Sequence, residues 1–315
     1  MKDLAQQAHE LITEQNRSWQ ALRIGRENLA KVQLRSFDFG NFTVQAAFNP
    51  ARLASSLAKV DDHSIKRRKC FLCDSNRPPE QKAIDCGDGF RLMCNPFPIL
   101  PEHFTIILDR HVPQRILPFF GKMLDLARKL GSRYTTFYNG PQSGASAPDH
   151  MHFQAGTKDY MPIDVEYDRV KRHFGDHDGA SVFVGENYLR RFIGIEGGDA
   201  GAVERAFARL HETFQALAPN TSEPMVNVLA SFDTDRRRWR IVVFLRVKHR
   251  PSFYFAIDHT KMLLSPGTVD VGGIVTTVLE EDFRRVGREH LVQMFEEITV
   301  SAQTLEHLAR ATSHM

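Results

Sequence analysis

The chain has 315 residues, of which 42% are hydrophobic and 25% are charged, and its formal net charge is +3. This composition is that of a globular protein with a sizeable core, in one large or two ordinary domains. The small net charge argues against nucleic-acid binding, and no apolar run reaches the roughly 20 residues of a membrane span. Without a signal-type apolar stretch at its start, the protein is expected in the cytoplasm, where its four cysteines are free thiols or metal ligands.

In its first half the sequence alternates strand and helix patterns. A helix is followed by a hairpin that turns at Gly40-Asn41, then by an irregular polar segment and short strands around one helix. The expected ranges are 1–32 (helix), 34–48 (hairpin), 60–83 (irregular), 89–95 and 104–109 (strands), 114–130 (helix), 133–139 and 150–156 (strands).

The second half repeats part of this order. After a charged, glycine-containing segment that we expect to be a linker, the order strand, helix, strand, strand occurs again, which predicts a duplicated α+β unit. The second copy has no histidines where the first has them. The expected ranges are 156–180 (linker), 190–195 (strand), 200–218 (helix), 224–232 and 238–246 (strands) and 287–312 (helix).

The stretch YNGPQSGASAPDHMHFQAG, residues 138–156, concentrates groups suited to phosphate chemistry. On a strand, His150, His152 and Gln154 share one face and the intervening apolar residues point to the other. The preceding loop of small residues can bring backbone N–H groups close to a phosphate. A neutral imidazole is a nucleophile toward phosphorus, and a neighbouring amide can donate to the phosphate oxygens. The alternative, half-buried structural histidines, is disfavoured by the regular alternation after such a loop.

A second cluster lies in RKCFLCD, where Cys70 and Cys73 have the C-x₂-C spacing of half a tetrahedral zinc site. Cys86 and Cys94 are poor candidates for the other half because their spacing is wrong for a second knuckle. Histidines fit better, and His103 is an alternative to one of them. The favoured set is Cys70, Cys73, His111 and His150. Four protein ligands leave no open position for water, so this zinc is expected to be structural.

Together these motifs resemble the nucleotidyltransferase branch of the histidine-triad superfamily. HMHFQ is similar to its H-x-H-x-Q active-site motif, and CFLC is similar to the zinc-binding segment of galactose-1-phosphate uridylyltransferases. PFPILPEHFTIILDRHVPQ and YNGPQSGASAPDHMHFQ resemble segments of diadenosine tetraphosphate phosphorylases, and DHMHFQA also resembles GDP-hexose phosphorylases. The resemblance covers about residues 70–154 and is vaguer elsewhere.

The resemblance implies an α+β fold, with a histidine-triad-like antiparallel sheet and flanking helices in two tandem copies. Residues 1–160 would form the catalytic lobe with the zinc segment, and residues 161–315 a second, degenerate lobe. His152 matches the histidine that accepts the nucleotidyl group, Gln154 the glutamine that contacts the transferred phosphate, and His150 a neighbouring zinc ligand.

Further residues are implied to bind the substrate. Asn95 and Asn139 resemble nucleotide-contacting asparagines, and Arg52 resembles a phosphate-binding arginine, although a solvated turn arginine is the alternative. The other candidates lie in the small-residue loop: Gln142, Ser143, Gly144 and Ser146. Asp149 stands where the uridylyltransferase pattern expects proline, which leaves base and sugar specificity open.

The function implied by the resemblance is nucleotidyl transfer through a nucleotidyl-His152 intermediate, favouring phosphorolysis of a dinucleoside polyphosphate or an NDP-hexose. The partners would be a nucleotide or nucleotide-sugar substrate, inorganic phosphate or a sugar 1-phosphate, and a second copy of the chain in a homodimer. Two alternatives remain. One is a hexose-1-phosphate uridylyltransferase, and the other is a catalytically inactive, zinc-stabilised nucleotide-binding protein.

Overall fold

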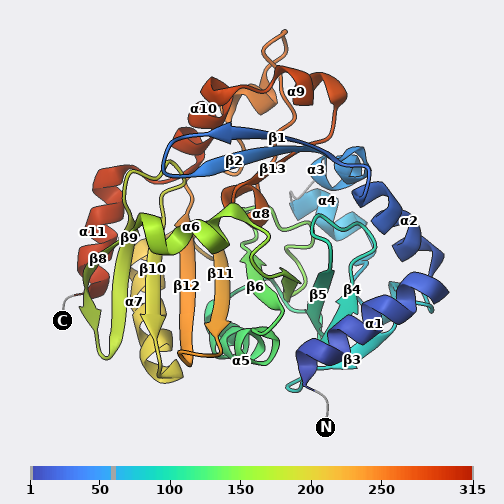
Figure 1. Cartoon of the computed structure of the whole chain (residues 1–315), viewed down its shortest axis with the longest axis horizontal. Helices are drawn as coiled ribbons and strands as arrows, with labels where there is room; N and C mark the ends of the chain where they lie inside the picture. The colour runs from blue at the N-terminus through green and yellow to red at the C-terminus, as the bar shows by residue number, and fades with distance from the viewer. Residues whose placement is uncertain (1–2, 58–61, 314–315) are drawn as a thin grey trace.

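Ten antiparallel strands form one continuous sheet across the molecule (Figure 1). The computed structural model describes residues 3–57 and 62–313. The strands are β3 (Ala83–Asp85), β4 (Phe90–Cys94), β5 (His103–Leu108), β6 (Tyr134–Asn139), β7 (His152–Thr157), β8 (Lys171–His177), β9 (Ala180–Gly185), β10 (Ile193–Gly197), β11 (Val226–Asp233) and β12 (Arg238–Leu245). Their order in the sheet is β3-β4-β5-β7-β6-β11-β12-β10-β9-β8.

This order contains two copies of one unit. The copies are β3-β4-β5-α5-β6-β7 and β8-β9-β10-α7-β11-β12, with α5 at Phe120–Leu130 and α7 at Ala200–Ala216. Read outward from the central β6–β11 pair, the strands of the two copies follow in the same relative order, so an approximate two-fold axis relates them. The expected α+β fold, with its repeated strand-helix-strand-strand order, is confirmed.

Helices cover one face of the large sheet. α5 and α7 stack through the rings of Phe120 and Phe207, whose centroids lie 3.7 Å apart. α1 (Leu4–Ser18) contacts α5 and β4, and α11 (Ala302–Ser313) contacts α7, β8 and β9. Every second strand residue, such as Phe153 in β7, enters the core beneath these helices.

A second, three-stranded sheet packs over the other face in the second copy (Figure 1). It consists of β1 (Gln33–Asp38), β2 (Thr43–Phe48) and β13 (Ile274–Thr277), and β13 runs parallel to β2. Segments from both ends of the chain therefore meet here. The helices that accompany it are α6 (Pro162–Val170), α8 (Thr268–Val271), α9 (Glu280–Arg285) and α10 (Arg288–Ile298).

Two expected helices are each divided into two. The helix expected at 1–32, whose residues 1–2 lie outside the described residues, is broken into α1 and α2 (Gln20–Leu29), because Trp19 adopts an extended conformation that buries its indole. The C-terminal helix is likewise divided into α10 and α11, because Thr299 is extended and Val300 donates its N–H to the carbonyl of Leu245.

The prediction that residues 156–180 form a linker is wrong, because this segment contains all of α6 and β8 and the last residues of β7. Ile163, Tyr167 and Val170 are buried at helical spacing. Their burial anchors α6, although the helix also contains several charged residues.

The expected irregular segment, 60–83, is partly helical. Its residues 60 and 61 lie outside the described residues, and the rest includes one helical turn before the cysteines and one after them. The short helical elements are η1 (Pro50–Arg52), α3 (Leu53–Ser56), α4 (Asp62–Arg67), η2 (Asp74–Asn76), η3 (Leu117–Phe119) and η4 (Ser252–Phe255). Among the described helices, none has the length and apolar character needed to cross a membrane.

Candidate active site

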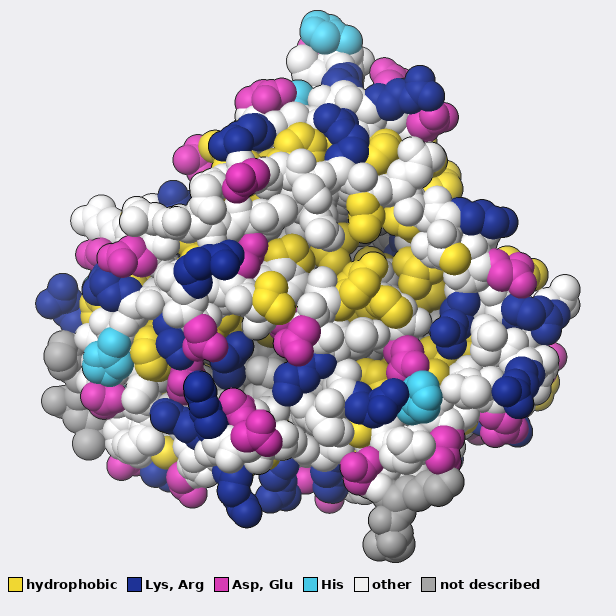
Figure 2. Space-filling view, viewed as in Figure 1, with side chains coloured by type: hydrophobic (Ala, Val, Ile, Leu, Met, Phe, Trp, Pro, Cys, Tyr) yellow, Lys and Arg dark blue, Asp and Glu magenta, His cyan; other side chains and the backbone are white. Residues whose placement is uncertain are grey.

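A cavity of about 720 Å³ lies on the face of the first copy that the small sheet leaves uncovered. Figure 2 shows a hollow near the centre of this face, bordered by hydrophobic side chains. Both copies contribute to its walls, the second through residues 249–250 and 265–276. The expected site residues that line it are Arg52, Asn95, Asn139, Gly144, Ser146, His152 and Gln154. Gln142 is exposed and Ser143 is fully buried, and neither lines the cavity.

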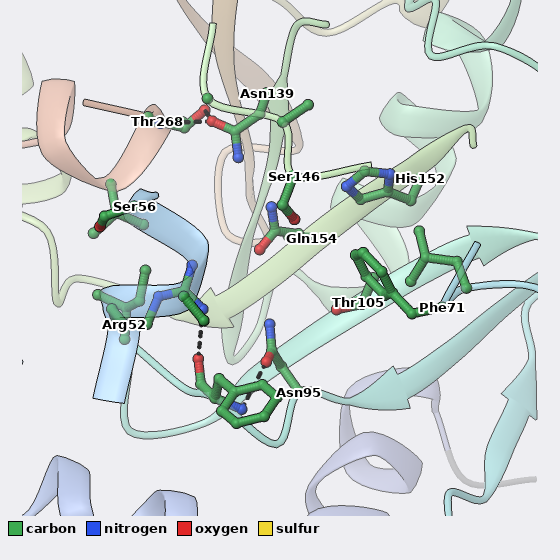
Figure 3. Close-up of a pocket in the computed structure, with 18 of the residues that line it drawn as sticks. Arg52, Ser56, Phe71, Asn95, Thr105, Asn139, Ser146, His152, Gln154 and Thr268 are labelled. Atoms are coloured by element: carbon green, nitrogen blue, oxygen red, sulfur yellow. Dashed lines mark hydrogen bonds between the residues drawn. The ribbon is translucent and has the colours of Figure 1, made fainter. Parts of the chain in front are cut away.

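His152 is the first residue of β7, and its imidazole lines the cavity wall (Figure 3). Its Nδ1 lies 2.7 Å from the carbonyl oxygen of His150. A carbonyl only accepts, so Nδ1 carries the proton and Nε2 keeps the lone pair of the neutral ring. Burial lowers the pKa of His152 to about 4, which keeps the ring neutral near pH 7. The neutral imidazole therefore has the tautomer that attack by Nε2 would require.

Gln114 fixes the backbone at this position. Its Oε1 accepts from the N–H of His152 (2.8 Å), and its Nε2 donates to the carbonyls of His152 (2.9 Å) and Asn139 (3.1 Å). The buried amide thus joins the end of β6 to the start of β7 where the ladder between them has stopped. The sequence did not identify Gln114, which was expected to begin a helix at 114–130, whereas α5 begins at Phe120 and Gln114 lies in the irregular segment before it.

The orientation of the Gln154 amide is also fixed by its neighbours. The N–H of Ile99 donates to His103 Nδ1 (3.2 Å), so His103 Nε2 carries the proton and donates to Gln154 Oε1 (2.8 Å). The NH₂ group of Gln154 then remains on the side of the cavity, beside Ser146 (Figure 3). Both ring nitrogens of His103 are occupied, so His103 has none left for a metal ion.

Asn139 is held by residues of the second copy. Its Oδ1 accepts from the N–H (2.8 Å) and Oγ1 (2.9 Å) of Thr268 and from Asn227 Nδ2 (3.0 Å). Buried Arg246 in turn donates to Asn227 Oδ1 (2.8 Å). With its oxygen used in this way, Asn139 presents its amide N–H groups to the cavity that it lines.

The small-residue loop lies directly against the second copy. Gly144 has a φ of +98°, and a Cβ there would lie 2.6 Å from the Cα of Gly267. A side chain at either glycine would push the loop away from the Thr268 segment, so the small residues allow the two backbones to meet.

The cavity wall carries several charges. Arg52 donates to the carbonyl of Phe97 (2.9 Å), and although burial lowers its pKa to about 10, it stays protonated near pH 7. Arg68 pairs with Asp149 (2.6 Å), and Arg250 donates to Ser265 Oγ (2.8 Å). These guanidinium groups make the cavity suitable for an anionic ligand.

Next to the nucleophile, the expected metal ligands come together. The ligand atoms of Cys70, Cys73, His111 and His150 all lie within 4.8 Å of one another. Cys70 Sγ lies 3.3 Å from His150 Nδ1, and Cys73 Sγ lies 3.3 Å from His111 Nδ1. Tetrahedral zinc, with bonds of about 2.3 Å to sulfur and about 2.0–2.1 Å to nitrogen, would separate S and N by about 3.5 Å. The cluster therefore has the composition and spacing of a metal site.

Neighbouring groups prepare these ligands. His150 Nε2 donates to the carbonyl of Leu108 (2.6 Å), which leaves Nδ1 as the ligand atom. Although burial opposes it, the hydrogen bond with His150 lowers the pKa of Cys70 to about 6, which favours the thiolate. Asp149, which stands in place of the expected proline, lies 3.6 Å from His111 Nε2.

Comparisons with known proteins agree with this architecture. Residues 11–157 match the model of a family described as a domain of unknown function, DUF4922. No curated protein is significantly similar in sequence. Yeast Ap4A phosphorylase Apa2 superimposes with a TM-score of 0.62 at 17% identity, over 97% of this chain and 98% of that chain. The structure of Apa2 in complex with Ap4A gives a TM-score of 0.59 at 15% identity, over 95% and 98%.

At 15–17% sequence identity, the superposition establishes that the two proteins share a fold. The chain has the expected α+β fold, an antiparallel sheet with flanking helices in two tandem copies, and it shares this fold with yeast Ap4A phosphorylase.

Proposed function

We propose that the chain is a nucleotidyltransferase that forms a nucleotidyl-His152 intermediate and passes the nucleotide to inorganic phosphate. The observation that carries this proposal is the tautomer of His152, whose Nδ1–H is held by the carbonyl of His150 beside the Gln154 amide. Support for phosphorolysis comes from the arginines of the cavity wall and from the fold of an Ap4A phosphorylase.

The reaction would take place in two displacements. Nε2 of His152 attacks the α-phosphorus of a dinucleoside polyphosphate or an NDP-hexose, and the P–N bond forms as the P–O bond to the leaving group breaks. An oxygen of inorganic phosphate then attacks the same phosphorus, breaks the P–N bond and gives a nucleoside diphosphate. The amides of Gln154 and Asn139 would donate to the non-bridging oxygens, and the His150 carbonyl would stabilise the positive charge on the ring.

Zinc is proposed for the Cys70, Cys73, His111 and His150 cluster because two sulfur and two nitrogen donors at this spacing are typical of closed structural zinc sites. Bound there, the ion would join the Cys70–Cys73 turn to His150, two residues before the nucleophile. Its part would be to fix the backbone that holds the His150 carbonyl.

The remaining expectations are part of the same proposal. Residues 1–160 would be the catalytic lobe and residues 161–315 the degenerate one, in a cytoplasmic enzyme that forms a homodimer. The substrate would contact the cavity-lining members of the expected set, which exclude Gln142 and Ser143.

A labelling experiment tests the proposal. The protein is incubated with dinucleoside polyphosphates and with UDP-, GDP- and ADP-hexoses that carry ³²P at the α-phosphorus, then denatured and mapped. We expect acid-labile label on His152 and its release as nucleoside diphosphate when inorganic phosphate is added. Release by hexose 1-phosphate alone would identify a uridylyltransferase-type enzyme. Binding without label under any pairing would identify the inactive binding protein.

A further inference from the structure

The cavity has a second polar end, formed by Asp270 of α8 and Thr276 of β13. Asp270 lies on α8 with Thr268, and Figure 3 shows Thr268, Ser56 and Arg52 on the side of the cavity opposite His152. Both side chains are more than nine-tenths buried, with 8% of the surface of each exposed. The groups at this end are therefore almost fully removed from bulk water.

The hydrogen bonds inside the chain do not use the full capacity of these side chains. Asp270 Oδ2 accepts from the N–H of Gly267 and Oδ1 from the N–H of Thr276, each at 2.8 Å, and a carboxylate can accept about four hydrogen bonds. The hydroxyl of Thr276 is buried and has no hydrogen-bond partner within residues 3–57 and 62–313. A buried hydroxyl left in this state costs folding free energy, and a ligand could satisfy it.

Charge decides which part of a nucleotide fits this end. Burial raises the pKa of Asp270 to about 6, so the carboxyl is largely ionised near pH 7. A hydroxyl group can donate to this carboxylate, whereas an ionised phosphate has no proton to donate to it. The charges of Arg246 and Arg52 offset that of Asp270, which allows the carboxylate to remain in a buried position.

We propose that Asp270 and Thr276 form a sugar-binding subsite that takes the vicinal hydroxyl groups of a ribose or a hexose. Asp270 would accept from two neighbouring hydroxyls, as acidic residues do in nucleotide sites, and Thr276 Oγ1 would donate to one of the sugar oxygens. The inference rests on the proposed function, which places the phosphate at His152 and Gln154 and the sugar along the cavity.

Equilibrium binding to the metal-loaded protein tests the subsite without turnover. Nucleoside diphosphates are titrated beside their 2′-deoxy counterparts, and NDP-hexoses beside their deoxyhexose counterparts. We expect wild-type protein to prefer the hydroxylated member of one pair by about 100-fold, because the analogue leaves buried groups unpaired. Thr276→Val should reduce that preference to below about 10-fold by weakening only the hydroxylated ligand, and Thr276→Ser should restore it.

The matched control is Thr277→Val. Thr277 follows in β13, does not line the cavity and donates to the carbonyl of Ala47 (3.2 Å), so its loss should affect the melting temperature and not the preference. Thr276→Val should melt no lower than wild type, since it removes a hydroxyl that has no partner among the described residues.

The two arms identify the sugar. If Thr276→Val loses the preference for the nucleoside diphosphate over its 2′-deoxy counterpart, the subsite binds a ribose. If it loses the preference for the NDP-hexose over its deoxyhexose counterpart, the subsite binds a hexose. An unchanged preference in both arms, or no preference in wild-type protein, overturns the subsite. If the preference behaves as expected and no label reaches His152, the transferase proposal fails and the sugar subsite stands.

Discussion

β7 of the first copy and β12 of the second occupy matching places in the sheet, yet they present different side chains to the same face. A row of direct cross-strand neighbours runs from Gln154 through Phe137 and Leu229 to Val242. Gln154 faces the cavity, whereas Val242 and, two residues on, Phe244 are buried in an apolar core. One backbone plan therefore carries a polar site in one copy and a packed core in the other.

The cover over each face explains the difference. In the second copy α6 lies over β12, and Arg240 donates to the carbonyl of Asp164 and to Asp168 of that helix. Within residues 3–57 and 62–313 no such helix fills the space over the first copy, and α8, with Thr268 and Asp270, forms part of the far wall instead. The second half of the chain thus supports the site from outside, while the matching face of the second copy is filled by packed apolar side chains.

The largest expected effect is on activity in the first copy. His152→Asn removes the nucleophile while keeping a polar side chain at the wall, so kcat should fall by about 10⁴-fold or more. The melting temperature and nucleotide binding should stay close to wild type. Steady-state kinetics with a calorimetric melt provide the measurement, and retention of a tenth of the activity would refute the assignment.

In the second copy the matching face should matter for stability alone. Phe244→Ala opens a cavity in the apolar core and should lower the free energy of unfolding by about 3–5 kcal/mol. Activity per folded molecule should not change. The control is Phe255→Ala, since that ring is 65% exposed and should cost less than about 0.5 kcal/mol. If kcat fell in Phe244→Ala protein that is fully folded, the proposed difference between the two copies would be wrong.

Metal binding should be confined to the first copy. Cys70→Ser removes a ligand, so metal content should fall from about one ion per chain, and the free energy of unfolding should fall by about 3 kcal/mol. Elemental analysis and a thermal melt measure the two quantities. Cys86→Ser is the control, because Cys86 is a buried thiol outside the cluster and its replacement should leave the metal in place. A wild-type protein free of metal would contradict the zinc proposal.

A smaller effect is expected from the amide that positions the nucleophile. Gln114→Leu removes three hydrogen bonds around His152 and Asn139, and kcat should fall by about 10- to 100-fold with little change in KM. The control variant in the second copy is Gln215→Leu. The side-chain amide of Gln215 donates to the carbonyls of Ala218 and Thr221. It should lower stability and leave kcat unchanged. Equal losses of kcat in both variants would indicate a general structural effect.

Much of the fold followed from local patterns. Period-two alternation placed β4 to β7 and β10 to β12, and the repeated element order predicted the duplication, because such patterns depend only on which face of a strand or helix is buried. The limits of helices were less predictable. Trp19 and Thr299 interrupt helical patterns because tertiary packing rewards an extended residue there.

The chemistry of the site was also partly present in the sequence. The spacing of His150, His152 and Gln154 predicted the strand that lines the cavity, because strand geometry fixes which side chains share a face. The C-x₂-C pair, with His111 and His150 added, predicted all four members of the Cys/His cluster. Of the expected loop residues, Gly144 and Ser146 line the cavity, whereas Gln142 and Ser143 lie outside its wall. The sequence alone cannot show which residues of a loop face a cavity.

Only the tertiary structure decided how these groups are held. The backbone position of His152, the orientation of Gln154 and the support of Asn139 depend on Gln114, His103 and Thr268. The wall with Asp270 and Thr276 comes from α8 and β13, more than a hundred residues along the chain. Sequence periodicity reports which face of an element is buried, but it does not report which distant element supplies the partner. Hydrogen bonds between residues remote in the chain therefore became predictable only once the two copies were packed together.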